Sequence, residues 1–245
     1  MQGGPWLLAG RVFRNPQLTA HPHLILVLHG DAPFVNPTYQ YVFAESAAQA
    51  LQNVVAVALL RPGYRDAQGE RSQGSRGLTT ADNYTSDRIV SIAAAARSLV
   101  ARYHASDLTL VGHSGGSAIA ADILELYPHL AARALLVSCP CDVAAFRWSM
   151  FKSQWNPMWL LPVASISPID HVSSIPRHIV IRMVTGSADD IAPPALTFAF
   201  ASALKQKGVD VRVIELKNKG HEILLEPAVI DQLRALLDAK PPAAD

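Results

Sequence analysis

Short apolar runs and longer amphipathic stretches alternate along the chain. Six runs rich in Leu, Val and Ile have the length of strands: Leu24–Leu28, Val54–Leu60, Leu108–Val111, Ala134–Ser138, His178–Thr185 and Val211–Glu215. Such continuous apolar runs are typical of strands that are covered on both faces. Between them, apolar residues recur at helical spacing in five segments: Tyr39–Gln52, Ser86–Tyr103, Ser114–Tyr127, Ala195–Lys207 and Pro227–Ala239. This alternation predicts an α/β fold with a mostly parallel sheet and helices on both faces.

Three further segments complete the predicted organisation. Trp6–Phe13 is expected to add an antiparallel edge strand. Arg61–Tyr84 is polar and glycine-rich, and Cys139–Arg177 is rich in prolines and aromatic residues. Both follow predicted strands, and ligands of parallel sheets bind beyond the carboxyl ends of the strands, so both should border a site. We expect one domain over residues 1–245, with a short cap-like insertion at about 139–177.

Composition and charge narrow the range of partners. Half of the 245 residues are apolar, 17% are charged and the net charge is +1. Without a long basic run, neither nucleic acid nor an anionic membrane is expected as the main partner. No apolar stretch approaches the length of a membrane span. The N-terminus lacks the pattern of a secretory signal, so a cytoplasmic protein is the simplest expectation, although removal of a leader would leave the same sequence.

The two cysteines form the sequence Cys139-Pro140-Cys141. They stand too close together for an easy disulfide, and a single C-x-C without further ligands is weak evidence for a metal site. We therefore expect both side chains to be buried or to line a pocket. The sequence gives no indication of a metal or a cofactor.

A serine motif lies between a predicted strand and a predicted helix. The residues Gly112-His113-Ser114-Gly115-Gly116 match G-x-S-x-G in the strand–turn–helix context that a nucleophilic serine requires. A serine at such a reversal has a strained backbone, so the positions two residues away need to be small. The first amides of the helix would then face a developing oxyanion. The alternative is a glycine-rich turn with an ordinary serine, which this context disfavours.

Three other local signatures join the serine motif. In chain order the four are His29-Gly30, the turn at Ser114, Gly186-Ser187-Ala188-Asp189-Asp190-Ile191-Ala192-Pro193, and Gly220-His221-Glu222. With the order of predicted elements, they resemble the α/β-hydrolase superfamily over nearly the whole chain from Leu24 onward. The resemblance extends to compact carboxylesterases, dienelactone hydrolases and the catalytic domains of prolyl oligopeptidases. It implies a serine hydrolase with the residue order serine, acid, histidine.

The resemblance assigns a role to each residue of a catalytic triad. Ser114 would be the nucleophile and His221 the base that accepts its proton. Asp189 would orient the imidazole of His221. Asp190, next to Asp189, remains an alternative for the acid, and so does Asp142, because some members of this fold carry the acid after that earlier strand.

Backbone amides are expected to form the oxyanion hole. Gly115, directly after the nucleophile, would supply one N–H group, and Asp31 the other. Many relatives have an apolar or small residue where Asp31 stands, so Ala32 remains an alternative for the second donor.

Side chains that could contact substrate are harder to choose. The candidates for a substrate pocket are His113, Trp148, Trp155 and Trp159. The aromatic residues of the cap-like segment either line an acyl or aromatic pocket or simply cover the edge of the sheet. The arginines at positions 61, 65, 71 and 76 either bind a substrate carboxylate or belong to a solvated loop.

These observations favour hydrolysis of carboxylic esters with small to medium acyl or aromatic groups through an acyl-enzyme. One alternative is a serine peptidase or amidase that acts on short peptides or acylated amino acids. Another is a non-catalytic binding protein on the same fold. The expected partner is a small-molecule ester or amide, and the sequence does not indicate the oligomeric state.

Overall fold

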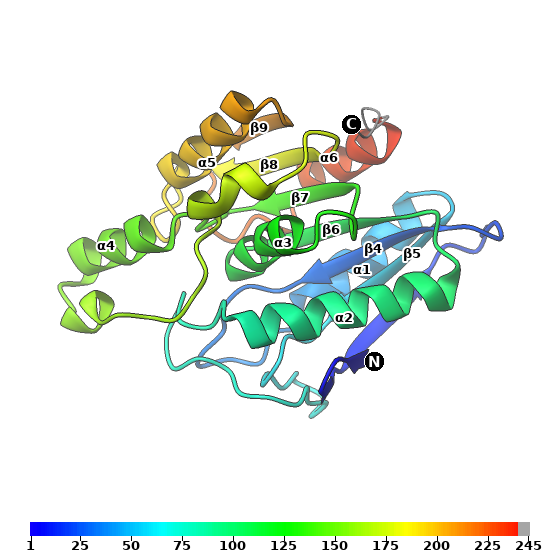
Figure 1. The fold of residues 1–245 in the computed structure, drawn as a ribbon, viewed down its shortest axis with the longest axis horizontal. Helices are drawn as coiled ribbons and strands as arrows, with labels where there is room; N and C mark the ends of the chain where they lie inside the picture. The colour runs from blue at the N-terminus through cyan, green and yellow to red at the C-terminus, as the bar shows by residue number, and fades with distance from the viewer. Residues whose placement is uncertain (240–245) are drawn as a thin grey trace.

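A seven-stranded sheet forms the centre of the computed structural model, which describes residues 1–239 (Figure 1). Residues 240–245, the end of the predicted domain, lie outside the described part. The strand order is β3-β5-β4-β6-β7-β8-β9. The bounds are β3 Gly10–Arg14, β4 His23–Leu28, β5 Val54–Leu59, β6 Asp107–His113, β7 Arg133–Val137, β8 Val180–Gly186 and β9 Asp210–Leu216. Strand β3 pairs antiparallel with β5, and the other neighbouring strands are parallel.

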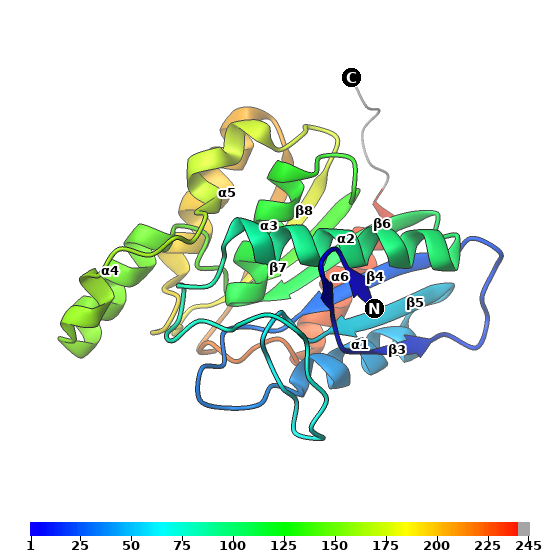
Figure 2. The ribbon, with the colours of Figure 1, turned by 60° about the horizontal axis from the view of Figure 1, so that its bottom comes forward.

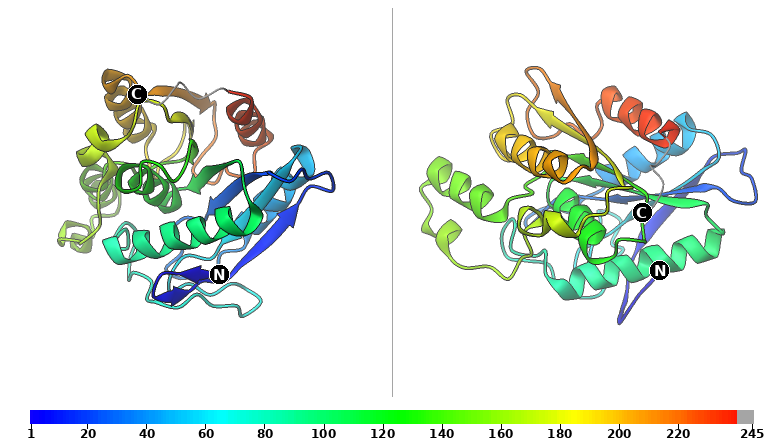
Figure 3. Two further views of the ribbon diagram at one scale, coloured as in Figure 1. Left: turned by 45° about the vertical axis from the view of Figure 1, so that its right-hand side comes forward. Right: turned by 45° about the horizontal axis from the view of Figure 1, so that its top comes forward.

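Helices cover both faces of the sheet (Figures 2 and 3). On one face lie α2 (Ser86–Tyr103), α3 (Gly115–Leu126) and α5 (Pro194–Lys207), and on the other lie α1 (Tyr39–Ala50) and α6 (Pro227–Asp238). Strand β4 shows why two layers are needed. Leu24, Leu26 and Leu28 belong to the apolar cluster of the first face, whereas Ile25 and Val27 belong to that of the second. Successive side chains point to opposite faces, so an apolar strand needs cover on both sides.

The predicted α/β fold is confirmed. Each predicted strand of the parallel sheet and each predicted helix is present, with boundaries that differ by at most two residues. The expected edge strand at Trp6–Phe13 is divided into two pieces. Residues Trp6–Leu7 (β2) pair with Gln2–Gly3 (β1) in a separate two-stranded sheet, and β3 forms the antiparallel edge of the main sheet.

The segment predicted as a cap-like insertion is largely helical. It holds α4 (Val143–Gln154) and two 3₁₀ helices, η1 (Pro157–Leu160) and η2 (Pro168–Ser174). Helix α4 extends beyond the end of the sheet in both views (Figures 1 and 2). Asp142 begins this helix, because its Oδ1 accepts the N–H of Ala145 at 2.9 Å, as an N-cap residue does. Among the described residues, no helix is both long enough and apolar enough to cross a membrane.

Two carboxyl groups are buried on α3 without a hydrogen-bond partner among the described residues. Asp122 is fully buried and Glu125 is 5% exposed. Burial, followed by the nearby Asp122 and Asp170, raises the pKa of Glu125 to about 10, and burial raises the pKa of Asp122 well above its usual range. Both side chains are therefore neutral in the folded protein near pH 7.

Replacement of Glu125 by glutamine should make stability less dependent on pH. Above its ordinary pKa of 4.5, the unfolded chain releases the Glu125 proton while the folded protein retains it up to pH about 10. Folding stability of the wild type therefore falls across this interval, by at most about 1.4 kcal/mol per pH unit for this group. Urea unfolding of the wild type and Glu125→Gln at pH 5, 7 and 9 measures the difference. The exposed Glu45→Gln control on α1 should follow the wild type, and parallel curves for Glu125→Gln would contradict the argument.

Candidate active site

Ser114 occupies the turn between β6 and α3. Its φ of 51° and ψ of −124° lie outside the ordinary region for a residue with a side chain. The backbone holds this conformation, because Ser114 N–H donates to the Val137 carbonyl at 2.8 Å and its own carbonyl accepts the Ser117 N–H at 2.8 Å. The turn thus has the strained geometry that the G-x-S-x-G motif predicts.

The flanking glycines are required by close backbone contacts. A Cβ atom on Gly112 would lie 2.4 Å from the Gly116 carbonyl oxygen. One on Gly116 would lie 2.4 Å from the carbonyl oxygen of Leu28, at the end of β4. Side chains at these positions would force the turn away from the sheet, which explains why both positions are glycine.

His221 and Asp189 form a buried pair in the loops after β9 and β8. The Nδ1 atom of His221 lies 2.9 Å from Oδ2 and 3.0 Å from Oδ1 of Asp189. The Asp189 carboxylate also accepts the N–H groups of Ile191 and Ala192, at 3.0 and 2.8 Å. A carboxylate that accepts Nδ1–H leaves Nε2 of the imidazole free to accept a proton.

The other two candidate acids lie elsewhere. Asp190 is exposed, and Asp142 caps α4. Of the three carboxylates, only that of Asp189 is hydrogen-bonded to His221.

Ser114 and His221 border the same cavity, which has a volume of about 580 Å³. His113 and Trp159, two of the four predicted pocket residues, also line it. About half of the other residues around it are apolar, including Phe34, Val35, Met150 and Ile191, and the rest are polar, including Asn36, Thr38 and the exposed Glu222. Among the described residues, no lysine or arginine lines the cavity.

The other two predicted pocket residues, Trp148 and Trp155, do not line this cavity. Trp148 lines a separate hollow of about 380 Å³, and Trp155 is 80% exposed. Helical periodicity explains the difference. Met150 and Gln154 form the stripe of α4 that faces the cavity, whereas Trp148 and Trp155 pack against Phe151 on another stripe.

Hydrogen bonds fix the main chain of His221. Its carbonyl oxygen accepts the Nε2–H of His113 and the hydroxyl of Ser138, both at 3.0 Å. Nδ1 of His113 accepts the hydroxyl of Tyr39 at 2.9 Å, and that hydroxyl accepts the Gly30 N–H at 2.6 Å. Burial, followed by the nearby His221, lowers the pKa of His113 to about 4, so His113 is neutral near pH 7. No sequence motif marks Tyr39 or Ser138, so these roles could not be predicted from the sequence.

His113 and His221, together with Glu222, form a group that has the composition of a metal site. Ligand atoms of His113, His221 and Glu222 lie within 4.8 Å of one another. However, both ring nitrogens of His113 and Nδ1 of His221 already have hydrogen-bond partners. A metal ion would have to break these bonds, so the arrangement fits a hydrogen-bonded network better than a set of ligands.

The arginines of the loop after β5 do not contribute a free charge to the cavity. Arg61 is 1% exposed and pairs with Asp31 at 3.0 Å. Arg76 donates to the Ala32 carbonyl at 3.4 Å. Thr80, near the end of this loop, does line the cavity, as does Gln154 in the later cap-like segment.

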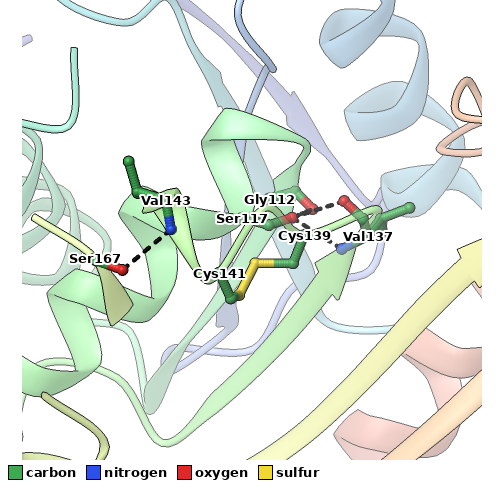
Figure 4. Close-up of a disulfide and its surroundings, with 7 residues drawn as sticks. All are labelled: Gly112, Ser117, Val137, Cys139, Cys141, Val143 and Ser167. Atoms are coloured by element: carbon green, nitrogen blue, oxygen red, sulfur yellow. Dashed lines mark hydrogen bonds between the residues drawn. A yellow bond between two sulfur atoms is a disulfide. The ribbon is translucent and has the colours of Figure 1, made fainter. Parts of the chain in front are cut away.

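The expectation that the two cysteines remain unpaired is wrong. Cys139 and Cys141 form a disulfide just beyond β7 (Figure 4). Their Cα atoms are 5.2 Å apart, which is within the range of ordinary disulfides. In an extended strand, Cα atoms two positions apart lie about 6.5 Å from each other, so the shorter separation shows that the backbone bends at Pro140 and brings the two side chains together. Both cysteines are fully buried, as expected.

Beside the disulfide, Ser117 connects α3 to the sheet. Its Oγ accepts the Val137 N–H at 2.9 Å and lies 2.6 Å from the Gly112 carbonyl oxygen (Figure 4). The start of α3 is therefore attached to both β6 and β7.

Known structures have the same fold. Est1E from Butyrivibrio proteoclasticus with ferulic acid bound superposes with a TM-score of 0.74, at 13% identity, over 97% of this chain and 98% of that chain. The esterase PE8 gives a TM-score of 0.68 at 16% identity, over 94% and 97%. A Mycobacterium tuberculosis puromycin-hydrolyzing peptidase gives 0.71 at 17% identity, over 97% of this chain but 38% of that longer chain. The sequence matches no curated protein.

The fold and the comparisons define a serine hydrolase of the α/β-hydrolase superfamily. Residues 76–238, about two thirds of the chain, match the sequence profile of the prolyl oligopeptidase family. The chain belongs to this family.

Removal of the Tyr39 hydroxyl should destabilise the site. Tyr39→Phe leaves the Gly30 N–H and the His113 ring without this partner, and an unpaired buried group costs about 1–3 kcal/mol. The free energy of unfolding, measured in urea, should fall by this amount. Tyr103→Phe is the matched control, because its hydroxyl makes one long contact, 3.4 Å from Arg14, near the surface. Equal losses in both variants would show that the Tyr39 network contributes nothing specific.

Proposed function

We propose that this serine hydrolase cleaves carboxylic esters with small to medium acyl or aromatic groups through an acyl-enzyme. The observation that carries the proposal is the arrangement of three residues. Ser114, at the strained turn, and His221 border one cavity, and the buried Asp189 is hydrogen-bonded to the far side of the imidazole. A nucleophile, a base and an orienting acid in this arrangement are suited to acyl transfer.

The reaction would proceed in two steps. The Oγ atom of Ser114 attacks the ester carbonyl while His221 Nε2 accepts its proton, and the tetrahedral intermediate expels the alcohol, which takes that proton. Water then attacks the acyl-enzyme, gives a proton to His221 and releases the carboxylic acid. Ser114 recovers its proton from His221. Asp189 stabilises the imidazolium in each step.

Backbone N–H groups of Gly115 and Asp31 would stabilise the oxyanion. Gly115 is the first residue of α3, whose N-terminal amides have no intrahelical acceptor. The Ala32 N–H, the alternative second donor, already donates to the Tyr64 hydroxyl at 3.4 Å. The Asp31 N–H has no acceptor among the described residues, which favours Asp31.

The surroundings of the cavity support an uncharged, fairly hydrophobic substrate. Phe34, Met150 and Trp159 reach it from the loop after β4 and from the cap-like segment. Apolar and aromatic walls with a few polar groups are typical of small-molecule sites. The volume of about 580 Å³ suits one acyl or aromatic group with a modest alcohol.

Reaction with a fluorophosphonate tests the nucleophile. The wild type should gain the mass of one adduct, and Ser114→Ala should gain none while remaining folded by circular dichroism. Asp189→Asn should react more slowly by orders of magnitude, about 10⁴-fold in the best-studied triad. Asp142→Asn is the matched control, since Asp142 caps α4, and should react at the wild-type rate.

Two results would count against the assignment. An adduct on Ser114→Ala would place the reactive serine elsewhere. No adduct on the wild type would favour the alternative of a non-catalytic binding protein on the same fold.

A second candidate function is cleavage of short peptides or acylated amino acids. One observation favours it besides membership of the prolyl oligopeptidase family. The exposed Glu222 lines the cavity next to His221 and forms no ion pair among the described residues. Such a carboxylate is suited to the amino group of a peptide.

Rates with two substrates distinguish the candidates. An esterase should hydrolyse p-nitrophenyl butyrate and leave aminoacyl p-nitroanilides intact. A peptidase should do the reverse, and Glu222→Gln should then raise KM for the aminoacyl substrate about tenfold or more while leaving the butyrate unaffected, because one charge-assisted bond is lost. Turnover of the anilide alone would overturn the esterase proposal.

A further inference from the structure

A buried carboxylate lies behind the proposed oxyanion hole. Asp31 borders the cavity, but its side chain is only 1% exposed, so the main chain is the part that faces the cavity. Oδ2 of Asp31 accepts the hydroxyl of Tyr84 at 2.6 Å and the N–H of Ala81 at 2.8 Å. The acidic side chain that departs from many relatives therefore points away from substrate, into the protein.

Arg61 supplies the opposite charge. Its Nη1 atom lies 3.0 Å from Oδ1 of Asp31 and donates to the His29 carbonyl at 3.2 Å. The backbone N–H of Arg61 donates to Nε2 of His29 at 3.0 Å. Its guanidinium also lies over the rings of Tyr64 and Tyr84. Burial opposes the charged form, but Asp31 and the two tyrosines outweigh burial and raise the pKa of Arg61, so the cation persists.

The carboxylate contacts both sides of the proposed hole. A Cβ atom built on Gly115 would lie 2.6 Å from the Tyr84 hydroxyl and 2.7 Å from Oδ1 of Asp31. The carboxylate is thus packed against the residue that carries one donor and is covalently attached to the residue that carries the other. A negative charge at this position, if unpaired, would repel the oxyanion that forms in the transition state.

We propose that Arg61 and Tyr84 are positioning residues of the oxyanion hole, which neutralise and orient the Asp31 carboxylate so that the Asp31 and Gly115 amides face the oxyanion. This inference rests on the proposed function. Neither side chain lines the cavity, so both residues act through Asp31 and not by contact with substrate. Without Arg61, the negative charge on Asp31 would oppose oxyanion formation. A packing role of Arg61 alone would not create this dependence on charge. Loss of Arg61 should be relieved by loss of the charge on Asp31.

The test compares Arg61→Met with the double variant Asp31→Asn/Arg61→Met, using p-nitrophenyl butyrate. Arg61→Met should lower kcat about 10²–10³-fold, the usual effect of losing one oxyanion donor, with KM changed less than about threefold. The double variant keeps an acceptor for Tyr84 but has no buried charge, and should recover kcat at least about tenfold over Arg61→Met. Arg133→Met is the matched control. Arg133, the first residue of β7, is a buried arginine that pairs with Asp107, the first residue of β6. It should lower stability and leave kcat unchanged.

Tyr84→Phe provides a milder variant in case Arg61→Met does not fold. It removes one hydroxyl from Asp31 and should lower kcat roughly tenfold with KM unchanged. Equal losses of kcat in Arg61→Met and Arg133→Met, or a double variant no better than Arg61→Met, would overturn the proposal. So would a Tyr84→Phe variant with wild-type kcat. Fluorophosphonate labelling of the wild type distinguishes the two proposals. If the wild type is not labelled, the catalytic role of Ser114 is refuted. If the wild type is labelled but the variants give the contrary results above, only the role of Arg61 and Tyr84 is refuted.

Discussion

The close backbone contact at the turn between β6 and α3 is the constraint on which the rest of the site depends. Gly112 packs against Gly116, and Gly116 packs against the carbonyl of Leu28 in β4, with no space for a side chain. As a result, α3 begins directly against the ends of two adjacent strands. The loop after β4 and the residue at the turn, Ser114, are therefore brought to one cavity by the main chain itself.

A second backbone contact brings Asp189 and His221 together. The loop after β8 and the loop after β9 are joined where the Ala188 N–H donates to the Lys219 carbonyl at 2.9 Å. Asp189 directly follows Ala188, and His221 lies two residues after Lys219, so the two side chains start from neighbouring points of the two loops. The position of the pair relative to Ser114 is set by the His221 carbonyl, which is bonded to a side chain of β6 and to Ser138 after β7. Rigid elements of the sheet thus fix the main chain of His221.

The sequence predicted the sheet and its helices well, because strands covered on both faces must be apolar and this pattern is local. It did not predict which residues of the cap-like segment face the cavity, because Trp148 on α4 and Trp159 on η1 are equally apolar and only the packing of the segment separates them. Arg61 is a similar case. An arginine in a polar, glycine-rich loop has the composition of a solvated residue, and its burial depends on Asp31 in an earlier loop and on Tyr84 at the far end of its own segment. The disulfide, by contrast, depends on the local bend of the backbone between its two cysteines, which the spacing C-x-C does not specify.

Each buried titratable group close to the proposed oxyanion hole is either neutral or paired with an opposite charge. His29 and His113 are neutral because burial lowers the pKa of each, and Asp31 is paired with Arg61. The field at the proposed oxyanion position therefore comes mainly from oriented amides, whose effect needs no reorganisation during the reaction. Glu125 has no such partner and remains protonated instead. The carboxylate at position 31 has three partners, because Oδ2 accepts the Tyr84 hydroxyl and the Ala81 N–H and Arg61 lies 3.0 Å from Oδ1. Within the described part of the chain, the buried carboxyl groups of α3 lack such partners, and at position 31 the opposite charge comes from Arg61.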